Sequence, residues 1–133
     1  MSAEPTEQAI IEAICRDGRY PLAAYVFLRQ GLEYTARRLF GEEAERQPRH
    51  VTGAQLCEGL RELAWERWGR LAPVVLRRWN IRRTRDFGEM VYFLIKIGAM
   101  SRQESDRIED FDDVYDLETA FDAFPAALDE GPE

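Results

Sequence analysis

The feature that most constrains this fold is a series of amphipathic segments with clear helix start and stop signals. Each segment begins at a capping residue or a proline and ends at a glycine or at a tryptophan–asparagine pair. The clearest start is the capping box Thr52-Gly53-Ala54-Gln55, in which the threonine hydroxyl and the glutamine amide satisfy the first free backbone donors. The apolar spacing predicts helices between Thr6 and Gly18, from Pro21 to Gly41, from Gly53 to Gly69, over residues 70–79 and between Thr84 and Gly98. The chain is therefore expected to be mainly α, with Asn80 as a left-handed helix stop.

The predicted helix from Pro21 to Gly41 has apolar side chains on two of its sides. Its main buried face is formed by Tyr25, Leu28, Leu32, Thr35, Ala36 and Leu39, and a second stripe by Phe27 and Tyr34. A helix of this kind usually lies between two neighbours in the core, and the alternative is a contact between two copies of the chain. Trp65 lies opposite Leu56 on its own helix, so it either packs against the long helix or is exposed to a partner.

Beyond Gly98 the pattern changes from helical to extended. Residues 99–102 and the apolar set Phe111, Val114 and Tyr115 predict a small β-hairpin around a polar loop. This element order is that of a winged helix-turn-helix, so residues 50–116 are expected to form a winged-helix-like unit with the helix after Thr84 in the recognition position. We expect a single domain over residues 1–124, in which the N-terminal helical pair packs on that unit. A last short helix is expected over residues 117–124, followed by an acidic flexible tail over residues 125–133.

Charge is distributed unevenly along the 133 residues. The formal net charge is −7, which argues against a general nucleic-acid coat protein. Residues 51–100 hold nine basic and five acidic side chains, whereas residues 101–133 hold two basic and twelve acidic ones. Arginine supplies seventeen of the eighteen basic residues, with Lys96 as the exception, and its planar fork suits carboxylate and phosphate groups.

No combination of residues in the sequence predicts an enzyme, a metal site or a cofactor. His50 is the single histidine, which removes multi-histidine metal sites and leaves a pairing with Cys57 as the nucleophile arrangement to consider. Cys15 and Cys57 lie among apolar neighbours and are expected to be buried structural thiols, the alternative being a disulfide or a metal pair. The sequence shows neither a secretory signal nor an apolar run of membrane-spanning length, so we expect a cytoplasmic protein without membrane contact.

The most specific functional candidate is an arginine cluster that spans one helix end and the turn into the next helix. Its members are Arg77, Arg78, Arg82, Arg83 and Arg85. The end of a helix by itself favours positive charge at Arg77 and Arg78, but this reason does not extend to Arg82 and Arg83. On the following helix Arg85, Glu89, Tyr92 and Lys96 recur at helical spacing, so we expect Tyr92 and Lys96 to extend the binding surface.

Two classes of partner suit these arginines. An acidic protein surface would make the chain a non-enzymatic interaction or regulatory module, whereas nucleic acid would make it a winged-helix transcriptional regulator. An acidic wing beside phosphate would repel it, which favours the protein partner. The acidic residues of the C-terminal third could also pair with the arginines, within one molecule as a mask or between two copies as a homodimer.

Several short motifs carry a family resemblance. They are Arg49-His50-Val51-Thr52-Gly53, Trp79-Asn80-Ile81-Arg82-Arg83-Thr84, Asp86-Phe87-Gly88-Glu89 and Asp110-Phe111-Asp112-Asp113-Val114-Tyr115-Asp116, with Asp17-Gly18-Arg19-Tyr20-Pro21 and Ala120-Phe121 in similar places. On these residues the chain resembles a Verruco/Plancto-restricted family of small uncharacterised bacterial proteins, over residues 8–124. The resemblance implies a shared fold, and it implies no catalytic residues.

Overall fold

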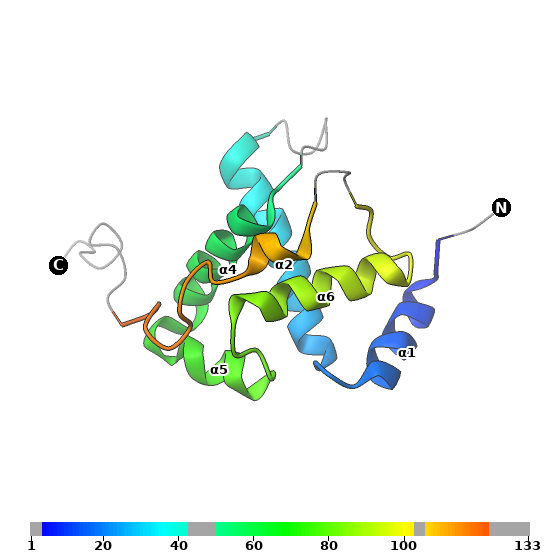
Figure 1. Ribbon diagram of the computed structural model, residues 1–133, viewed down its shortest axis with the longest axis horizontal. Coiled ribbons are helices and arrows are strands. Elements are labelled where there is room, and N and C mark those ends of the chain that lie inside the picture. The colour runs from blue at the N-terminus through cyan, green and yellow to red at the C-terminus, as the bar shows by residue number, and fades with distance from the viewer. Residues whose placement is uncertain (1–3, 43–49, 103–105, 123–133) are drawn as a thin grey trace.

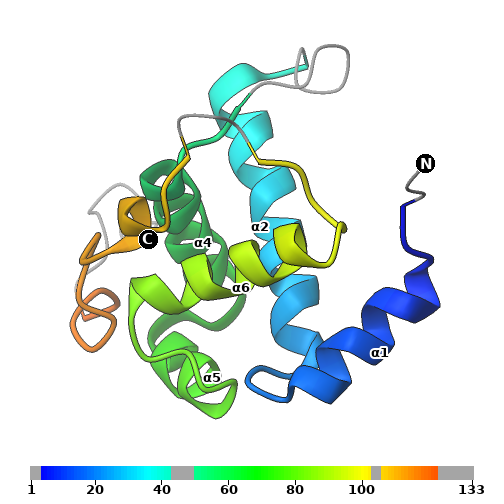
Figure 2. The same cartoon turned by 45° about the vertical axis from the view of Figure 1, so that its right-hand side comes forward.

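The computed structural model describes residues 4–42, 50–102 and 106–122, and it is mainly α-helical (Figure 1). The α-helices in these ranges are α1 (Glu7–Asp17), α2 (Leu22–Phe40), α4 (Gly53–Trp68), α5 (Ala72–Arg78) and α6 (Thr84–Lys96). Two short 3-10 helices are also present: η1 (Gly69–Leu71) precedes α5, and η2 (Ile108–Phe111) follows α6. α2 and α4 pack on one another, and α6 crosses in front of them with α1 and α5 near its two ends (Figures 1 and 2). No helix in the described ranges is long and apolar enough to cross a membrane.

The helix ends follow the local signals in the sequence. Thr6 caps α1 through its Oγ1, which accepts a hydrogen bond from the Ala9 amide at 3.0 Å. At the start of α4 the Thr52 hydroxyl accepts from the Gln55 amide at 3.1 Å, and the Gln55 side chain accepts from the Thr52 amide at 3.0 Å, which confirms the capping box. After α5, Asn80 has a φ of 67°, which confirms the predicted left-handed stop.

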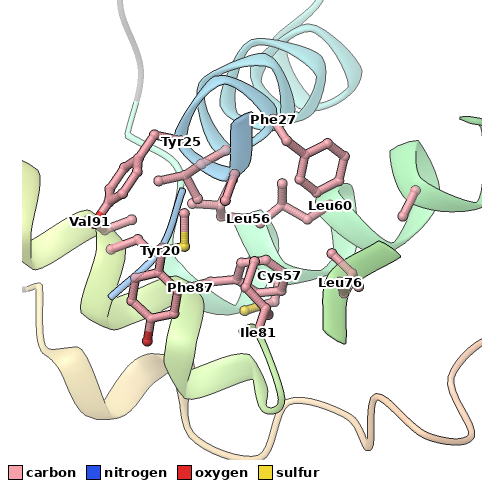
Figure 3. Close-up of a cluster of buried hydrophobic side chains, with 14 of the residues drawn as sticks. Tyr20, Tyr25, Phe27, Leu56, Cys57, Leu60, Leu76, Ile81, Phe87 and Val91 are labelled. Atoms are coloured by element: carbon pink, nitrogen blue, oxygen red, sulfur yellow. The ribbon is translucent and has the colours of Figure 1, made fainter. Parts of the chain in front are cut away.

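The long helix α2 is buried on two sides, as its two apolar stripes predict. The Phe27 ring lies 5.2 Å from the Trp68 ring and 5.7 Å from the Trp79 ring, whereas Tyr25 packs against Phe93 with ring centroids 6.1 Å apart. Figure 3 shows Tyr25 and Phe27 in the core, on different sides of this helix. The predicted burial of Leu39 is wrong, because this side chain is 44% exposed and borders an open depression beside the first turn of α4.

Two glycines allow α2 and α4 to approach closely. A Cβ added at Gly31 would lie 2.1 Å from the Leu60 Cδ2 atom, and one added at Gly59 would lie 1.7 Å from the Thr35 Oγ1 atom. Both distances are far below van der Waals contact, so the two helices can pack in this way only where these positions lack a side chain. The Thr35 hydroxyl donates to the Gly31 carbonyl at 2.7 Å, which satisfies a polar group buried in the same contact.

The predicted β-hairpin is wrong, and the winged-helix prediction that depended on it is not supported. Residues 99–102 and 106–122 contain no strand, and η2 followed by turns replaces the second expected strand. The Phe111 ring packs where α4 and α6 carry Gly53 and Gly88, at which an added Cβ would lie 2.9 Å and 2.8 Å from it. The Thr84 hydroxyl donates to the Phe111 carbonyl at 2.6 Å and accepts from the Val114 amide at 3.1 Å. Backbone groups that a strand would pair are therefore bonded to α6.

The last short helix is also absent from its described part. Residues 117–122 form successive turns, in which Leu117, Ala120 and Phe121 are buried. The Arg61 Nε atom donates to the Ala120 carbonyl at 3.2 Å, which occupies an acceptor that a continuing helix would use. Residues 123–124 and the predicted tail over residues 125–133 lie outside the described residues. Trp65 is half-buried and packs against the core, so it is not an exposed anchor as the second of its two alternatives proposed.

Candidate functional site

The structure divides the predicted binding residues among three places. Arg77 and Arg78 end α5, Arg82 and Arg83 stand in the turn between α5 and α6, and Arg85, Tyr92 and Lys96 follow along α6. We call the first four residues, Arg77, Arg78, Arg82 and Arg83, the arginine corner. In Figure 1 the chain turns sharply at this position from α5 into α6.

The backbone of the arginine corner is held by Asp86, in the first turn of α6. The Asp86 Oδ2 atom accepts hydrogen bonds from the Arg82 amide at 2.8 Å and from the Arg83 amide at 3.0 Å. The Asp86 Oδ1 atom accepts from the Tyr20 hydroxyl at 2.6 Å. Ile81 is 1% exposed and ties the turn to the core, where Figure 3 shows it near Leu76. A carboxylate at this position is favoured by the free amides and the positive dipole of a helix start, so the turn has a fixed shape.

A second set of contacts joins the same turn to the residues that follow α1. The Asn80 side chain donates to the Arg19 carbonyl at 3.1 Å. The Arg19 guanidinium pairs with Asp17 at 3.0 Å and with Glu89 at 3.4 Å. Thr84 was expected to cap α6, but it is the first residue of the helix and its hydroxyl bonds the segment around η2. Asp86 performs the capping in its place.

The side chains of the arginine corner are exposed to solvent. Within the described ranges, the Arg77, Arg78 and Arg83 side chains make no hydrogen bond or ion pair. Arg82 donates from Nε to the Asn80 Oδ1 atom at 3.4 Å, which uses one of its five donors. The corner therefore presents a dense positive charge and many unused donors on a fixed backbone, which is the chemistry of an anion-binding surface.

The Arg85 side chain pairs with carboxylates of the fold, so it is not available to a partner in the way that the arginine corner is. Its Nη1 atom pairs with both carboxylate oxygens of Asp112, at 2.9 Å and 3.1 Å, and its Nε atom lies 3.4 Å from Glu89. The hydrogen bond with Asp112 raises the pKa of Arg85 above its ordinary value. These contacts tie the residues after η2 to the first turns of α6. The predicted five-arginine cluster is therefore divided into the four exposed side chains of the arginine corner and one side chain, that of Arg85, that pairs with carboxylates of the fold.

Tyr92 and Lys96 lie on surfaces other than the arginine corner. Tyr92 lines a cleft of about 200 Å³ together with His50 and Asp106. In this cleft the His50 Nε2 atom lies 2.7 Å from the Asp106 Oδ1 atom. Lys96 ends α6, at the opposite end of the helix from the corner. It is the one exposed residue of α6, because the segment around η2 covers much of the outward face of this helix. Little of the helix in the expected recognition position is therefore fully exposed.

The exposed apolar side of α5 was not predicted from the sequence. Leu71 is 66% exposed and Val74 is 46% exposed, although Val74 reads as part of an apolar run. Helical spacing could have predicted the exposure of Val74. Ala72 and Leu76 are four residues apart and both buried, and Val74 between them lies on the opposite side of the helix. Arg70, beside Leu71, is exposed as well.

The two thiols differ in environment. Cys57 is buried as predicted, and this burial raises the pKa of its thiol to about 12. The predicted burial of Cys15 is wrong, because the neighbouring Ile14 faces the core and a helix turns the next side chain away from it. Both thiols are free. In the parts of the chain that the structure describes, no three histidine, cysteine or carboxylate side chains gather in a group that could hold a metal ion.

Comparisons with models of protein families, with curated proteins and with solved structures find no match to this chain.

Proposed function

We propose that this protein is a non-enzymatic, cytoplasmic interaction module of a regulatory kind, which binds an acidic surface of another protein through the arginine corner. The observation that carries the proposal is a group of four exposed arginines on a backbone fixed by Asp86 and Ile81. Within the described ranges three of these arginines have no hydrogen-bonding or ionic partner.

The physical reason is the cost of ordering a binding surface. A guanidinium presents a planar fork that matches a carboxylate with two parallel hydrogen bonds. Because the turn already has its bound shape, association orders the arginine side chains but not the backbone beneath them. Complementary charge also speeds the encounter with an acidic partner and rejects basic ones.

The charge around the corner favours a protein partner over nucleic acid. Arg83 shares a surface depression with Glu89, Asp112 and Asp113, so a continuous phosphate backbone at Arg83 would pass close to these carboxylates. A protein partner can instead place single carboxylates at the guanidinium groups. Nucleic acid is the alternative partner for the same arginines, and the experiment below tests it directly.

The test is fluorescence anisotropy with three labelled probes: a twelve-residue polyglutamate peptide, a mixed-sequence DNA duplex and a single-stranded oligonucleotide. Each probe is titrated with the full chain at low and moderate salt. We expect the acidic peptide to bind and the variant Arg82→Ala with Arg83→Ala to lose at least severalfold in affinity. The matched control is Arg16→Ala with Arg29→Ala, two exposed arginines on α1 and α2, which should bind like the unchanged chain.

Either of two results would overturn the proposal. Tighter binding of an oligonucleotide, with a salt slope that falls by about one unit for each corner arginine removed, would assign the corner to phosphate. Equal binding by the corner variant and the control would remove the corner from function. Light scattering on the same samples distinguishes a further case, because a mass twice that of one chain, lost in the corner variant, would identify the acidic partner as a second copy.

We also propose, on the motifs quoted for the resemblance, that this chain shares the fold of the family that it resembles. Tyr20 and Asp86, which belong to two of the quoted motifs, bond one another at 2.6 Å. Arg85 bonds Asp112 of a third motif. Residues that are far apart in the sequence thus meet where they form the fold.

A further inference from the structure

The outer side of α5 and of the turn before it combines apolar and basic side chains. Leu71 is 66% exposed and Val74 is 46% exposed, and Leu71 is the most exposed large apolar side chain of the described ranges. Ala72 and Leu76 are the residues of α5 that face the core, with exposed fractions of 0% and 2%. Leu71 and Val74 therefore contribute little to the packing of this helix.

Exposed arginines flank these two residues. Val74 lies three positions before Arg77 and four before Arg78, so the three side chains share one side of the helix. Arg70 stands beside Leu71 on the preceding turn and is exposed as well. We call Arg70, Leu71, Val74, Arg77 and Arg78 the α5 outer face. It joins the arginine corner through Arg77 and Arg78, which belong to both.

A shallow groove continues this surface toward the turn. It has a volume of about 130 Å³, and its apolar lining is Pro73, Leu76, Ile81 and Leu117. Its charged lining residues are Arg77, Arg82 and Glu118. The groove therefore combines apolar side chains with two arginines and one carboxylate. The α5 outer face likewise combines apolar side chains, Leu71 and Val74, with arginines.

We propose that the α5 outer face binds a short acidic segment of the partner protein that also carries large apolar side chains. The inference rests on the proposed function and adds the chemistry of the partner. Carboxylates of the segment pair with Arg70, Arg77 and Arg78, while its apolar side chains cover Leu71 and Val74. Covering exposed apolar surface contributes to binding in a way that charge alone does not, and it adds selectivity against polyanions without apolar groups.

The experiment is a selection from a displayed library of random twelve-residue peptides on the immobilised full chain. Three further baits are selected in parallel. The first is Leu71→Ser with Val74→Ser, and the second is Arg77→Ser with Arg78→Ser. The third is the control Val26→Ser with Leu39→Ser, a valine and a leucine of α2 that are 47% and 44% exposed. Circular dichroism verifies that each bait is folded.

We expect the unchanged chain and the α2 control to enrich peptides that contain several carboxylates and at least two large apolar residues. The Leu71 and Val74 variant should enrich acidic peptides without this apolar requirement, and the arginine variant should lose the acidic requirement. In a titration of the best peptide, serine at its apolar positions should weaken binding about tenfold, which equals about 1.4 kcal/mol. This last change is made in the peptide, so it does not depend on the folding of any variant.

The possible failures are distinguishable. Enrichment of acidic peptides by the unchanged chain without apolar residues would overturn this inference and leave the proposed function standing. Enrichment of no acidic peptide would overturn both. Vesicles that contain phosphatidylserine serve as a competitor, and their displacement of the selected peptide from the unchanged chain but not from the Leu71 and Val74 variant would assign the face to a membrane and overturn the inference.

Discussion

The start of α6 and the outer face of α5 are close in the sequence, and they use their side chains in opposite ways. At the start of α6, Asp86 accepts three hydrogen bonds, the Thr84 hydroxyl both donates and accepts, and Arg85 pairs with Asp112. On the outer face of α5, Leu71 and the arginines are exposed, and the guanidinium groups of Arg77 and Arg78 have no partner in the described ranges.

The difference shows that a cluster of like charges in a sequence need not be one site. Arg83 and Arg85 are two residues apart, yet only Arg85 reaches carboxylates that stabilise the fold. A polar group that is satisfied in the folded chain contributes to stability, and binding a partner through it would first break that contact. The groups left exposed on a fixed backbone are the ones that can bind at little structural cost.

The largest expected effect that separates the two regions comes from Phe111, which is 5% exposed beneath the start of α6. Phe111→Ala should lower the free energy of unfolding by about 3–5 kcal/mol, because it removes a buried ring and leaves a cavity between α4 and α6. Leu71→Ala on the α5 outer face should change it by less than about 0.5 kcal/mol. Urea unfolding followed by circular dichroism measures both, and equal losses would contradict the comparison.

A smaller loss is expected when the capping carboxylate is removed. Asp86→Ala should lower the free energy of unfolding by about 2–3 kcal/mol, because it leaves the Arg82 and Arg83 amides and the Tyr20 hydroxyl without their acceptor. The control is Glu33→Ala, an exposed carboxylate on α2. Thermal unfolding of both variants is the measurement, and a loss no greater than that of the control would mean that Asp86 does not hold the turn.

The Tyr20 hydroxyl makes the stability of this region dependent on alkaline pH. Burial and, after it, the hydrogen bond to Asp86 raise the pKa of Tyr20 well above its ordinary value. The folded state therefore favours the neutral phenol, so its contribution is complete below about pH 10, the ordinary tyrosine value, and is lost as the pH rises above it.

Tyr20→Phe should lower the free energy of unfolding by about 1.5 kcal/mol at pH 7, the value of a hydrogen bond to a charged group. The difference between this variant and the unchanged chain should shrink as the pH rises above about 10, because only the unchanged chain loses the Tyr20 contribution. Urea unfolding at a series of pH values tests this. A difference that stays constant up to pH 11 would show that the folded chain does not raise the pKa of Tyr20.

The smallest effect is expected from the arginines themselves. Arg85→Ala and Asp112→Ala should each lower the melting temperature slightly at low salt, and the double variant should lose less than the two single losses added together. Arg83→Ala should leave the melting temperature unchanged. High salt should reduce the loss in Arg85→Ala, since screening weakens a half-exposed ion pair. Identical behaviour of Arg83→Ala and Arg85→Ala would remove the distinction between free and paired arginines.

The helices could be predicted because the signals for their ends are local. The capping box at Thr52 and Gln55 and the left-handed Asn80 each depend on a few consecutive residues, and the structure confirms them. The hairpin could not be excluded in the same way. The place of Phe111 is decided by Gly53 and Gly88, which lack side chains in two different helices, and no local pattern around Phe111 reports this.

The sequence by itself determined where most helices begin and end, and it placed five arginines around one turn. The tertiary structure alone decided that Arg85 leaves that group and that Thr84 bonds the η2 segment. The reason is separation along the chain. Caps and helical faces are set by neighbours within one or two turns, whereas Asp112 lies 27 positions from Arg85 and Asp86 lies 66 positions from Tyr20. Which charge remains free depends on such distant contacts, and only the packed chain brings them together.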